Sequence, residues 1–564
     1  MSVVKFSLTK FQANTGHLFP KGKLDNQHRT FINRRLFSVT TVITYMDMDS
    51  VKLWPPSHST RLILVERIIK NLSTPSIISR KYGLLSKEEA EEDAKQIESA
   101  AFVAATQHFE KEPESDGGSA VQVYAKESSK LMVEFLKTGP KHKEDRDTIP
   151  GLTTSNHEHV FDISGGRRAF IDAEEAKELL KPLKEPGNKF TKIRFSNRSF
   201  GLPAAHVAAT VLSSVKDQLT EVDLSDIVSR RPEPEAIGVM QMFSSALEGA
   251  QLSALNLSNN ALGEKGVRAF GALLKSQGNL VELSFMNAGI SHEAAKAVCE
   301  LIPSTSKLKI LQFHHNMMGD EGAIAIAQLV KGSPNLEDFR CSSTRIGSAG
   351  GVALAEALKT CTLLKKLDLR DNMFGPKPGV SLGNALHANL TEIYLSYLNL
   401  ENEGSIALAN ALKQSKSALE IIEMAANNIT SEAAAKALAD CMISNKQSLT
   451  RINLSENEIK DAGAIVIAKA LEDAFERLCV VDLSTNGIET GGAMALAKAV
   501  VGKPGFRLLN INGNFLSSKG IQGVREIFKD FPRMLGPLDE NDPRGDGFDE
   551  LESKLKDLEM KQKE

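Results

Sequence analysis

Two adjacent arginines, Arg230 and Arg231, precede two prolines in the segment LSDIVSRRPEPEA, residues 224–236. A guanidinium group presents several N–H donors in one plane and binds carboxylate or phosphate oxygens well. Pro232 and Pro234 restrict the backbone, so we expect a stiff loop over 224–236 that keeps both arginines exposed at the surface. Surface arginines are often only solvated or paired with a nearby glutamate, and this alternative stays open.

The loop interrupts a pattern that repeats from about residue 190 to 516. Seven copies fit LxxLxLxxNxL, and they begin at residues 252, 308, 364, 419, 449, 478 and 506. Five weaker copies, which make twelve in all, begin at Phe190, Leu219, Leu280, Leu336 and Leu390. The asparagines recur at intervals of one or two repeat lengths, which indicates a solenoid whose repeats pack only against their neighbours.

Each copy has the composition of a strand followed by a helix. The LxL core is typical of a short strand with its leucines inward, and the asparagine amide can satisfy backbone groups in the turn. Alanine-rich segments such as 320–331 and 430–442 have helical spacing, with Ser291 or Thr430 as helix N-caps. A strand plus a full helix within every repeat resembles the ribonuclease-inhibitor-like leucine-rich repeat. We therefore predict an α/β leucine-rich-repeat solenoid, a crescent of about twelve repeats.

The pattern is broken in two informative ways. Five repeats hold another residue in the asparagine position: Arg198, Ile227, Ala288, Thr344 and Leu398. In one of them Asn287 stands one place earlier, so we expect its amide to be exposed and outside the asparagine ladder. The spacing also fails once, because the step from Val222 to Leu255 is longer than the next step, from Leu255 to Leu283. The extra length falls in the arginine loop.

The sequence EVDLSDIVSRRPEPEA (221–236), followed by LNLSNNALG (255–263), resembles the early repeats of the Ran GTPase-activating proteins. That family is a leucine-rich-repeat crescent whose catalytic loop carries an arginine after an SDI sequence. Matching from the SDI sequence places this arginine on Arg231, with Arg230 as the alternative by one residue, and places an important asparagine of the family on Asn287.

The resemblance implies that the chain stimulates hydrolysis of GTP bound to Ran. It would do so mainly by holding the GTPase's own catalytic glutamine in place, with a Ran-binding protein as a further co-activator. GTP and magnesium would be carried by the GTPase, so we expect no cofactor, no metal and no independent active site. A leucine-rich-repeat adaptor without this activity is the alternative.

Polar residues at the predicted inner face provide further candidate contacts. We assign GTPase binding to Asp226, Arg230, Asn256 and Asp368. The outward strand positions also include Asp223, Asp482, Asn453 and Asn510. An acidic strip of this kind could steer a basic partner, and an ordinary solvated sheet face is an equal alternative.

Residues 49–140 lack the repeat and show helical spacing at 62–69, after Ser86 and at 121–137, which predicts a small all-α domain. The segments LWPPS, TPSI, SRKYGLLS and YAKESSKLM resemble the plant WPP domain. That resemblance implies docking on coiled-coil proteins of the nuclear envelope through Trp54, Pro55 and Pro56, although Trp54 could also be only a core anchor. It implies a location in the cytoplasm and at the outer nuclear envelope, and on spindle and cell-plate structures in dividing cells.

The remaining segments are a predicted disordered extension (1–48), a linker (141–160) and a mildly acidic tail (536–564), which leave 161–535 for the repeats. Residues 1–45 hold seven Lys and Arg against one Asp, a composition that a transit peptide or an alternative start would explain. No apolar run approaches the roughly 18 residues of a membrane span, so we expect contact with membranes only through protein partners. A net charge of −3 gives no pull toward nucleic acid, and five cysteines without CxxC pairs argue against zinc.

Overall fold

The computed structural model describes two stretches of the chain in detail. In the N-terminal part it describes residues 87–111 and 118–138, together with Pro56, Arg61, Leu64, Val65, Ile68, Ile69 and Leu72. In the rest it describes residues 159–164, 168–386, 388–415, 417–473 and 475–542. The chain divides into two compact units, Met1–Asp145 and Arg146–Glu564. None of the described helices is long and apolar enough to cross a membrane.

The N-terminal unit is helical in its described residues. Helices α5 (Lys87–Phe109) and α6 (Gly118–Thr138) pack against each other, and buried residues Leu64, Ile68 and Leu72 complete two small apolar clusters with them. Arg61 donates to both carboxylate oxygens of Glu98 at 2.6 and 2.8 Å, which ties the preceding helical segment to α5. The predicted all-α fold is confirmed, whereas Ser86 lies outside the described residues.

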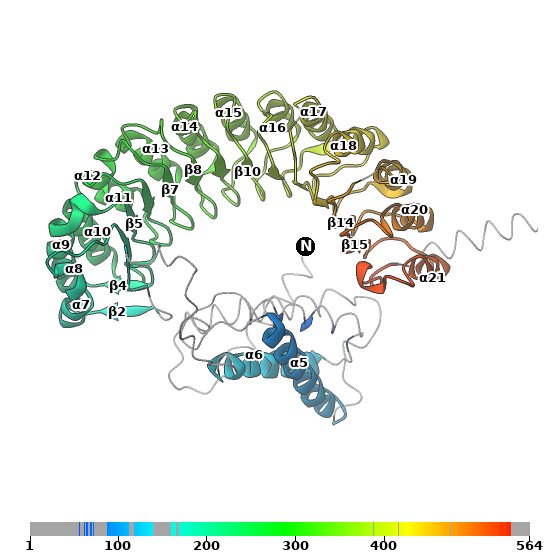
Figure 1. The fold of residues 1–564 in the computed structure, drawn as a ribbon, viewed down its shortest axis with the longest axis horizontal. Coiled ribbons are helices and arrows are strands. Elements are labelled where there is room, and N and C mark those ends of the chain that lie inside the picture. Colours follow the sequence, from blue (N-terminus) through cyan, green and yellow to red (C-terminus); the bar gives the residue numbers. More distant parts are fainter. Residues whose placement is uncertain are drawn as a thin grey trace, which may run out of the picture. The chain divides into compact units, whose positions relative to one another are not determined.

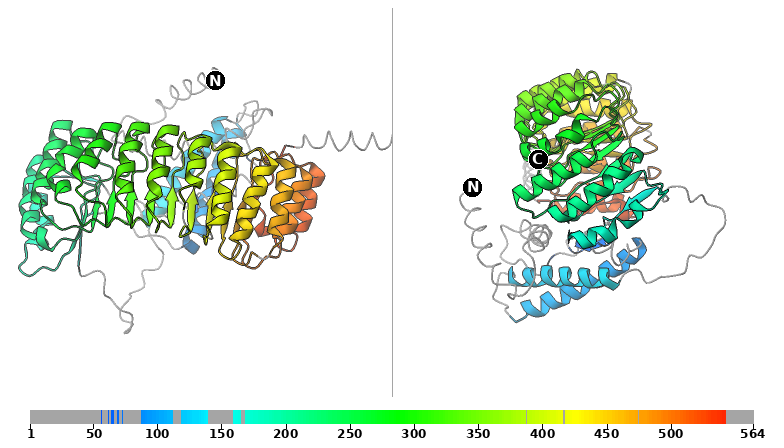
Figure 2. Two further views of the ribbon diagram at one scale, coloured as in Figure 1. Left: turned by 90° about the horizontal axis from the view of Figure 1, so that it is seen from above. Right: turned by 90° about the vertical axis from the view of Figure 1, so that its left-hand side faces the viewer.

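The second unit is a curved array with strands on its inner side and helices on its outer side (Figure 1). Among the described residues of this unit, thirteen parallel strands form one sheet in the order β1, β3, then β5 to β15. Figure 2 shows that neighbouring helices lie side by side in a row. The predicted leucine-rich-repeat solenoid is confirmed.

The strands of the large sheet have three residues each, and their bounds are β1 Val160–Asp162, β3 Lys192–Arg194, β5 Glu221–Asp223, β6 Ala254–Asn256, β7 Glu282–Ser284, β8 Ile310–Gln312, β9 Asp338–Arg340, β10 Lys366–Asp368, β11 Glu392–Tyr394, β12 Ile421–Glu423, β13 Arg451–Asn453, β14 Val480–Asp482 and β15 Leu508–Asn510. A second sheet pairs β2 (Ala169–Ile171) with β4 (Arg198–Phe200) in parallel. The helices of this unit are α7 Ala173–Leu179, α8 Lys181–Lys184, α9 Leu202–Val215, α10 Glu233–Ala246, α11 Gly263–Ala269, α12 Gly271–Lys275, α13 His292–Leu301, α14 Gly319–Lys331, α15 Ser348–Leu358, α16 Pro376–Gly383, α17 Glu401–Gln414, α18 Glu432–Ser444, α19 Lys460–Leu471, α20 Thr490–Val500 and α21 Ser518–Ile527.

Burial of the central residue of each strand explains the sheet. Val222, Leu255 and Leu283 are at most 2% exposed, while their neighbours on the same strands face the inner surface. All twelve predicted repeats form a strand at the predicted place. Strand β1 is a thirteenth strand that the repeat pattern did not predict, and it pairs with β3 in register Phe161 to Ile193.

The asparagine ladder satisfies backbone groups between the repeats. Asn316 is buried; its Nδ2 donates to the carbonyl oxygens of Phe285 (2.8 Å) and Phe313 (2.6 Å), and its Oδ1 accepts from the amides of Ala288 and Ile290. Each of these groups lies in the dry interior, where an unpaired backbone group would be costly. The ladder therefore fixes each turn to the one before it.

Helix capping agrees with the prediction in one case and differs in the other. Ser291 caps α13 by accepting from the amide of Ala294, as predicted. Helix α18 is capped by Ser431, which accepts from Ala434, so the assignment of Thr430 was wrong by one residue. Serine and threonine are both favourable N-caps, and the position at which the helix starts decides between them here.

Candidate functional site

The arginine loop is shorter than predicted, because α10 already begins at Glu233. Pro232 is the residue before the helix, and Pro234 lies in its first turn, where a missing backbone N–H costs no helical hydrogen bond. The loop therefore spans 224–232 rather than 224–236. Part of the extra repeat length lies in α10 itself, which has 14 residues against 10 in α13.

The first half of the loop is built into the array. Ile227 is fully buried; its amide donates to Oδ1 of Asn260 at 2.9 Å, and its carbonyl accepts from the amide of Phe200 at 2.8 Å. The amide of Asp226 donates to the carbonyl of Ser258 at 3.0 Å. These bonds connect the loop to the repeats on both sides, so its backbone has little freedom.

Arg231 is held against the neighbouring repeat. Its Nη2 donates to the carbonyl of Ser199 at 2.8 Å, its Nε donates to the hydroxyl of Ser199 at 3.2 Å, and its Nη1 lies 3.3 Å from a carboxylate oxygen of Glu235. The guanidinium carbon lies 5.0 Å from the ring centre of Phe170. Only 17% of the Arg231 side chain is exposed, so the prediction of an exposed Arg231 was wrong.

Arg230 differs from its neighbour in both backbone and exposure. It is exposed, and its φ of 62° lies in the left-handed region, which turns the chain before Pro232. The two candidate arginines thus have distinct geometries. Arg230 lies on the outside of the turn, and Arg231 is a partly buried guanidinium with fixed direction.

Asp226 is buried, with 4% of the residue exposed, and its carboxylate accepts from Nε of Arg168 at 2.7 Å. Burial raises the pKa of this carboxyl, and the charge of Arg168 acts in the opposite direction. Asp368 is also buried, and Arg370 covers it with two hydrogen bonds of 3.0 and 2.7 Å. In the free chain both carboxylates are thus paired with arginines of the same chain, and their contact with the GTPase stays a prediction.

Asn287 lies at the surface of the turn after β7. Its Nδ2 donates to Oδ1 of Asn259, one repeat earlier, at 3.0 Å, and its side chain takes no part in the ladder, as predicted. Its φ is 48°. The equivalent residue is left-handed in every described repeat from β3 onward: Asn197, Asp226, Asn259, Asn287, His315, Ser343, Asp371, Tyr397, Ala426, Glu456, Thr485 and Gly513. Asparagine adopts this conformation readily, so the backbone also favours it here.

Three adjacent repeats bring these groups together. Asp226, Asn259 and Asn287 occupy the same position after β5, β6 and β7, which are neighbours in the sheet. Asn256, the predicted contact on β6, is half-buried and accepts from the amide of Ser258 at 3.0 Å. Sequence reasoning missed Asn259, although its place one full repeat before Asn287 was a usable signal.

The inner face carries charges of both signs rather than an acidic strip. The arginines pair with their own neighbours, Arg340 with Asp338 at 2.6 Å and Arg370 with Glu423 at 3.2 Å. An excess of negative charge remains around Glu282, whose pKa is raised by burial and by nearby carboxylates. Of the two equal alternatives, an ordinary solvated sheet face fits this surface better than an acidic strip. Among the described residues, no group of three His, Cys, Asp or Glu side chains could hold a metal ion.

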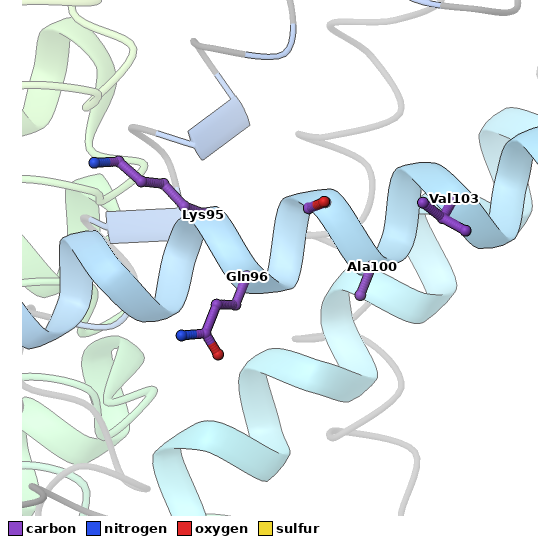
Figure 3. Close-up of a pocket in the computed structure, with 5 residues that line it drawn as sticks. Lys95, Gln96, Ala100 and Val103 are labelled. Carbon is purple, nitrogen blue, oxygen red and sulfur yellow. The ribbon is translucent and has the colours of Figure 1, made fainter.

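Of the three predicted targeting residues, the structure describes only Pro56. Trp54 and Pro55 lie outside the described residues, and Pro56 is half-buried. One exposed side of α5 carries Lys95, Gln96, Ser99, Ala100 and Val103, and these residues line a shallow surface pocket (Figure 3).

Comparison with known proteins agrees with both units. Over 91% of its length the chain is 61% identical to "RAN GTPase-activating protein 2" and 62% identical to "RAN GTPase-activating protein 1", both of Arabidopsis thaliana. It covers 98% and 97% of those two proteins. The chain belongs to the RAN GTPase-activating protein family. The resemblance noted in the arginine loop therefore extends over nearly the whole molecule.

The two Arabidopsis thaliana proteins align over both units of the chain. The family model of the WPP domain matches residues 50–146, and that of the leucine-rich repeat matches 252–271, 306–327 and 445–468. The N-terminal part is also 44% identical over 89 residues to "MFP1 attachment factor 1" of Solanum lycopersicum, which covers 16% of this chain and 57% of that protein. The chain thus combines an N-terminal WPP domain with the leucine-rich repeats of a RAN GTPase-activating protein.

Proposed function

We propose that this chain is the GTPase-activating protein of Ran and accelerates hydrolysis of Ran-bound GTP to GDP. The observation that carries the proposal is the identity of 61% and 62% to two proteins named for this activity, over nearly their whole length. By supporting a cycle of Ran between its GTP and GDP forms, the chain would serve transport between nucleus and cytoplasm and Ran gradients in mitosis. Ran would bind in its GTP form.

The site suggests how the acceleration works. Asn287 presents an amide on a turn fixed by its neighbours, and we assign to it the positioning of the catalytic glutamine of Ran. A glutamine that orients the attacking water needs no new chemistry from the activator, only a fixed geometry. GTP and magnesium belong to Ran, and the chain itself uses no cofactor and no active site of its own.

The loop arginine supports the complex. Matching to the family favours Arg231, whose fixed guanidinium can brace the switch regions of Ran from the side; Arg230 is the alternative because it is the more exposed of the two. The half-buried Asn256 remains a contact candidate on β6. Separate Arg230→Ala and Arg231→Ala variants compare the arginines, and the one that contacts Ran most directly should lower kcat/KM more strongly.

A hydrolysis assay tests the proposed function. Purified full-length chain is added in catalytic amounts to Ran loaded with GTP, and phosphate release is followed. We expect stimulation by several orders of magnitude, as GTPase-activating proteins give about 10³- to 10⁵-fold effects. No acceleration would leave the alternative of a leucine-rich-repeat adaptor, in which the array binds proteins without stimulating hydrolysis.

For the WPP domain we propose docking on coiled-coil proteins of the nuclear envelope, supported by the match to a protein named as an attachment factor. The chain would then act in the cytoplasm and at the outer nuclear envelope, peripheral to the membrane, and on spindle and cell-plate structures during division. A Ran-binding protein would act there as co-activator. A Trp54→Ala variant of a fluorescent fusion should lose its rim staining, and an unchanged rim would contradict this role of Trp54, Pro55 and Pro56.

A further inference from the structure

The small sheet at the N-terminal end of the array lies against the arginine loop. Strand β2 pairs with β4 in the register Phe170 to Ser199. Ser199 is the residue whose carbonyl and hydroxyl accept from Arg231. The hydroxyl of Ser199 in turn donates to the carbonyl of Ser229 in the loop at 2.8 Å. The second half of the loop therefore rests on this sheet.

Two side chains of the β2 segment reach the two ends of the loop. Arg168 precedes the strand and donates from Nε to the carboxylate of Asp226 at 2.7 Å. Phe170, two residues later, places its ring 5.0 Å from the guanidinium carbon of Arg231. Alternation along an extended segment puts Arg168 and Phe170 on one side, and Ile171 is buried on the other.

The contacts of Arg168 with Asp226 and of Phe170 with Arg231 belong neither to the asparagine ladder nor to the apolar core of the repeats. Phe170 keeps 50% of its surface exposed, so it adds little to the apolar core, and its main packing partner in the loop is a charged group. Asp226 is a buried carboxylate that depends on Arg168 for its charge balance. Together the two contacts fix the direction of the loop from outside the asparagine ladder.

We propose that Arg168 and Phe170 are positioning residues for the proposed GTPase-activating reaction. They brace the two ends of loop 224–232 and so hold Arg230 and Arg231 in the geometry that meets Ran. This inference rests on the proposed function. The residues proposed to act on Ran otherwise lie only in the turns after β5, β6 and β7. The inference adds Arg168 and strand β2, which support these turns from one side.

Full-length variants test the brace with two independent measurements. For Arg168→Met and Phe170→Leu we expect kcat/KM for Ran loaded with GTP to fall about tenfold, since a displaced contact of this kind costs about 10- to 100-fold. The loss should appear mainly in KM, because the braced groups support binding. Hydrogen exchange at the amides of 226–231 should become faster in both variants. Arg168→Lys and Phe170→Tyr should recover most of the activity, because they keep the charge and the ring.

Matched controls separate the brace from general stability. Phe531 is 43% exposed near the C-terminal end of the array, and Arg477 lies 4.0 Å from Glu420 on another repeat. Phe531→Leu and Arg477→Met should leave both kcat/KM and loop exchange unchanged. The inference is overturned if the β2 variants behave like these controls, or if loop exchange rises while kcat/KM stays the same. If the wild-type chain fails to stimulate Ran, the proposed function is overturned instead. The brace can still be tested in that case, because unchanged hydrogen exchange at the amides of 226–231 in the β2 variants would overturn it.

Discussion

The two ends of the leucine-rich-repeat array use the same turn in different ways. In the C-terminal repeats, Asn427, Asn457, Asn486 and Asn514 are all buried in the ladder. Of the four N-terminal repeats, three hold Arg198, Ile227 or Ala288 at the ladder position and one holds Asn260. In all four an asparagine or aspartate stands one residue earlier: Asn197, Asp226, Asn259 and Asn287. The backbone is left-handed at that earlier position in both regions. The regions therefore differ at the ladder position, which lacks its buried asparagine in three of the four N-terminal repeats.

A buried amide stabilises the scaffold, whereas an exposed amide can bind a partner. Asn486 is fully buried and donates to the carbonyl oxygens of Leu454 (2.9 Å) and Ser484 (3.0 Å), so it serves the scaffold. Asn287 is exposed and donates to another surface side chain, that of Asn259. An amide of the second kind can exchange its partner for a group of a bound protein at small cost. We expect substitutions in the two regions to separate activity from stability.

The largest expected effect is on activity. Asn287→Ala should lower kcat/KM for Ran by about 100-fold, the range seen when one positioned hydrogen-bond donor is removed. The free energy of unfolding of this variant should fall by only about 1 kcal/mol, because alanine adopts the left-handed conformation less readily than asparagine. Stopped-flow phosphate release and thermal unfolding measure the two quantities.

Asn428→Ala is the matched control for that substitution. Asn428 is also exposed, has a φ of 55° and donates to the side chain of Asn399 one repeat earlier. It should show the same small stability loss with unchanged stimulation of Ran. Equal activity losses in the two variants would mean that the N-terminal turns have no special role.

The next effect is on stability. Asn486→Ala should lower the free energy of unfolding by roughly 3 kcal/mol, since it leaves buried carbonyl oxygens without a donor. Activity at a temperature where the variant remains folded should be unchanged. Chemical denaturation followed by circular dichroism measures the loss of unfolding free energy. A loss no larger than that of Asn428→Ala would contradict the scaffold role of the ladder.

The smallest effect is a pH dependence at Asp226. Its pKa is raised by burial, so the folded state binds a proton more readily than the unfolded state, and stability falls as pH rises through that pKa. Arg168 opposes this shift, and Arg168→Met should raise the pKa further. The variant should therefore lose more stability at pH 7 than near pH 4, where unfolded aspartate begins to be protonated at about 3.9. Chemical denaturation at both pH values measures the loss of unfolding free energy in Arg168→Met, with Arg477→Met as the control. A loss that is the same at both pH values would contradict the role of Arg168.

The sequence predicted the parts of the molecule that depend on periodicity. Twelve strands and the exposed position of Asn287 followed from spacing alone, because each repeat has the same local environment. Strand β1, the β2–β4 sheet and the burial of Arg231 did not follow from it. They depend on contacts such as Ser199 with Arg231, 32 residues apart, and Arg168 with Asp226, 58 residues apart, which no repeat pattern marks.

The same limit applies to the charged residues. The sequence predicts GTPase contacts for Asp226 and Asp368 without showing their partners within the chain. Their burial depends on Arg168 and Arg370, whose side chains fold over them. A sequence lists charges but does not show which of them pair within the molecule, so it could not decide between an acidic strip and an ordinary sheet face.

The central claim is that the turns after β5 to β7, and not the inner face as a whole, meet the nucleotide of Ran. A structure of the full chain bound to Ran with a non-hydrolysable GTP analogue tests it most directly. We expect the amide of Asn287 within hydrogen-bonding distance of the catalytic glutamine of Ran, with loop 224–232 against its switch regions. A complex that places both of them far from the nucleotide would contradict the claim.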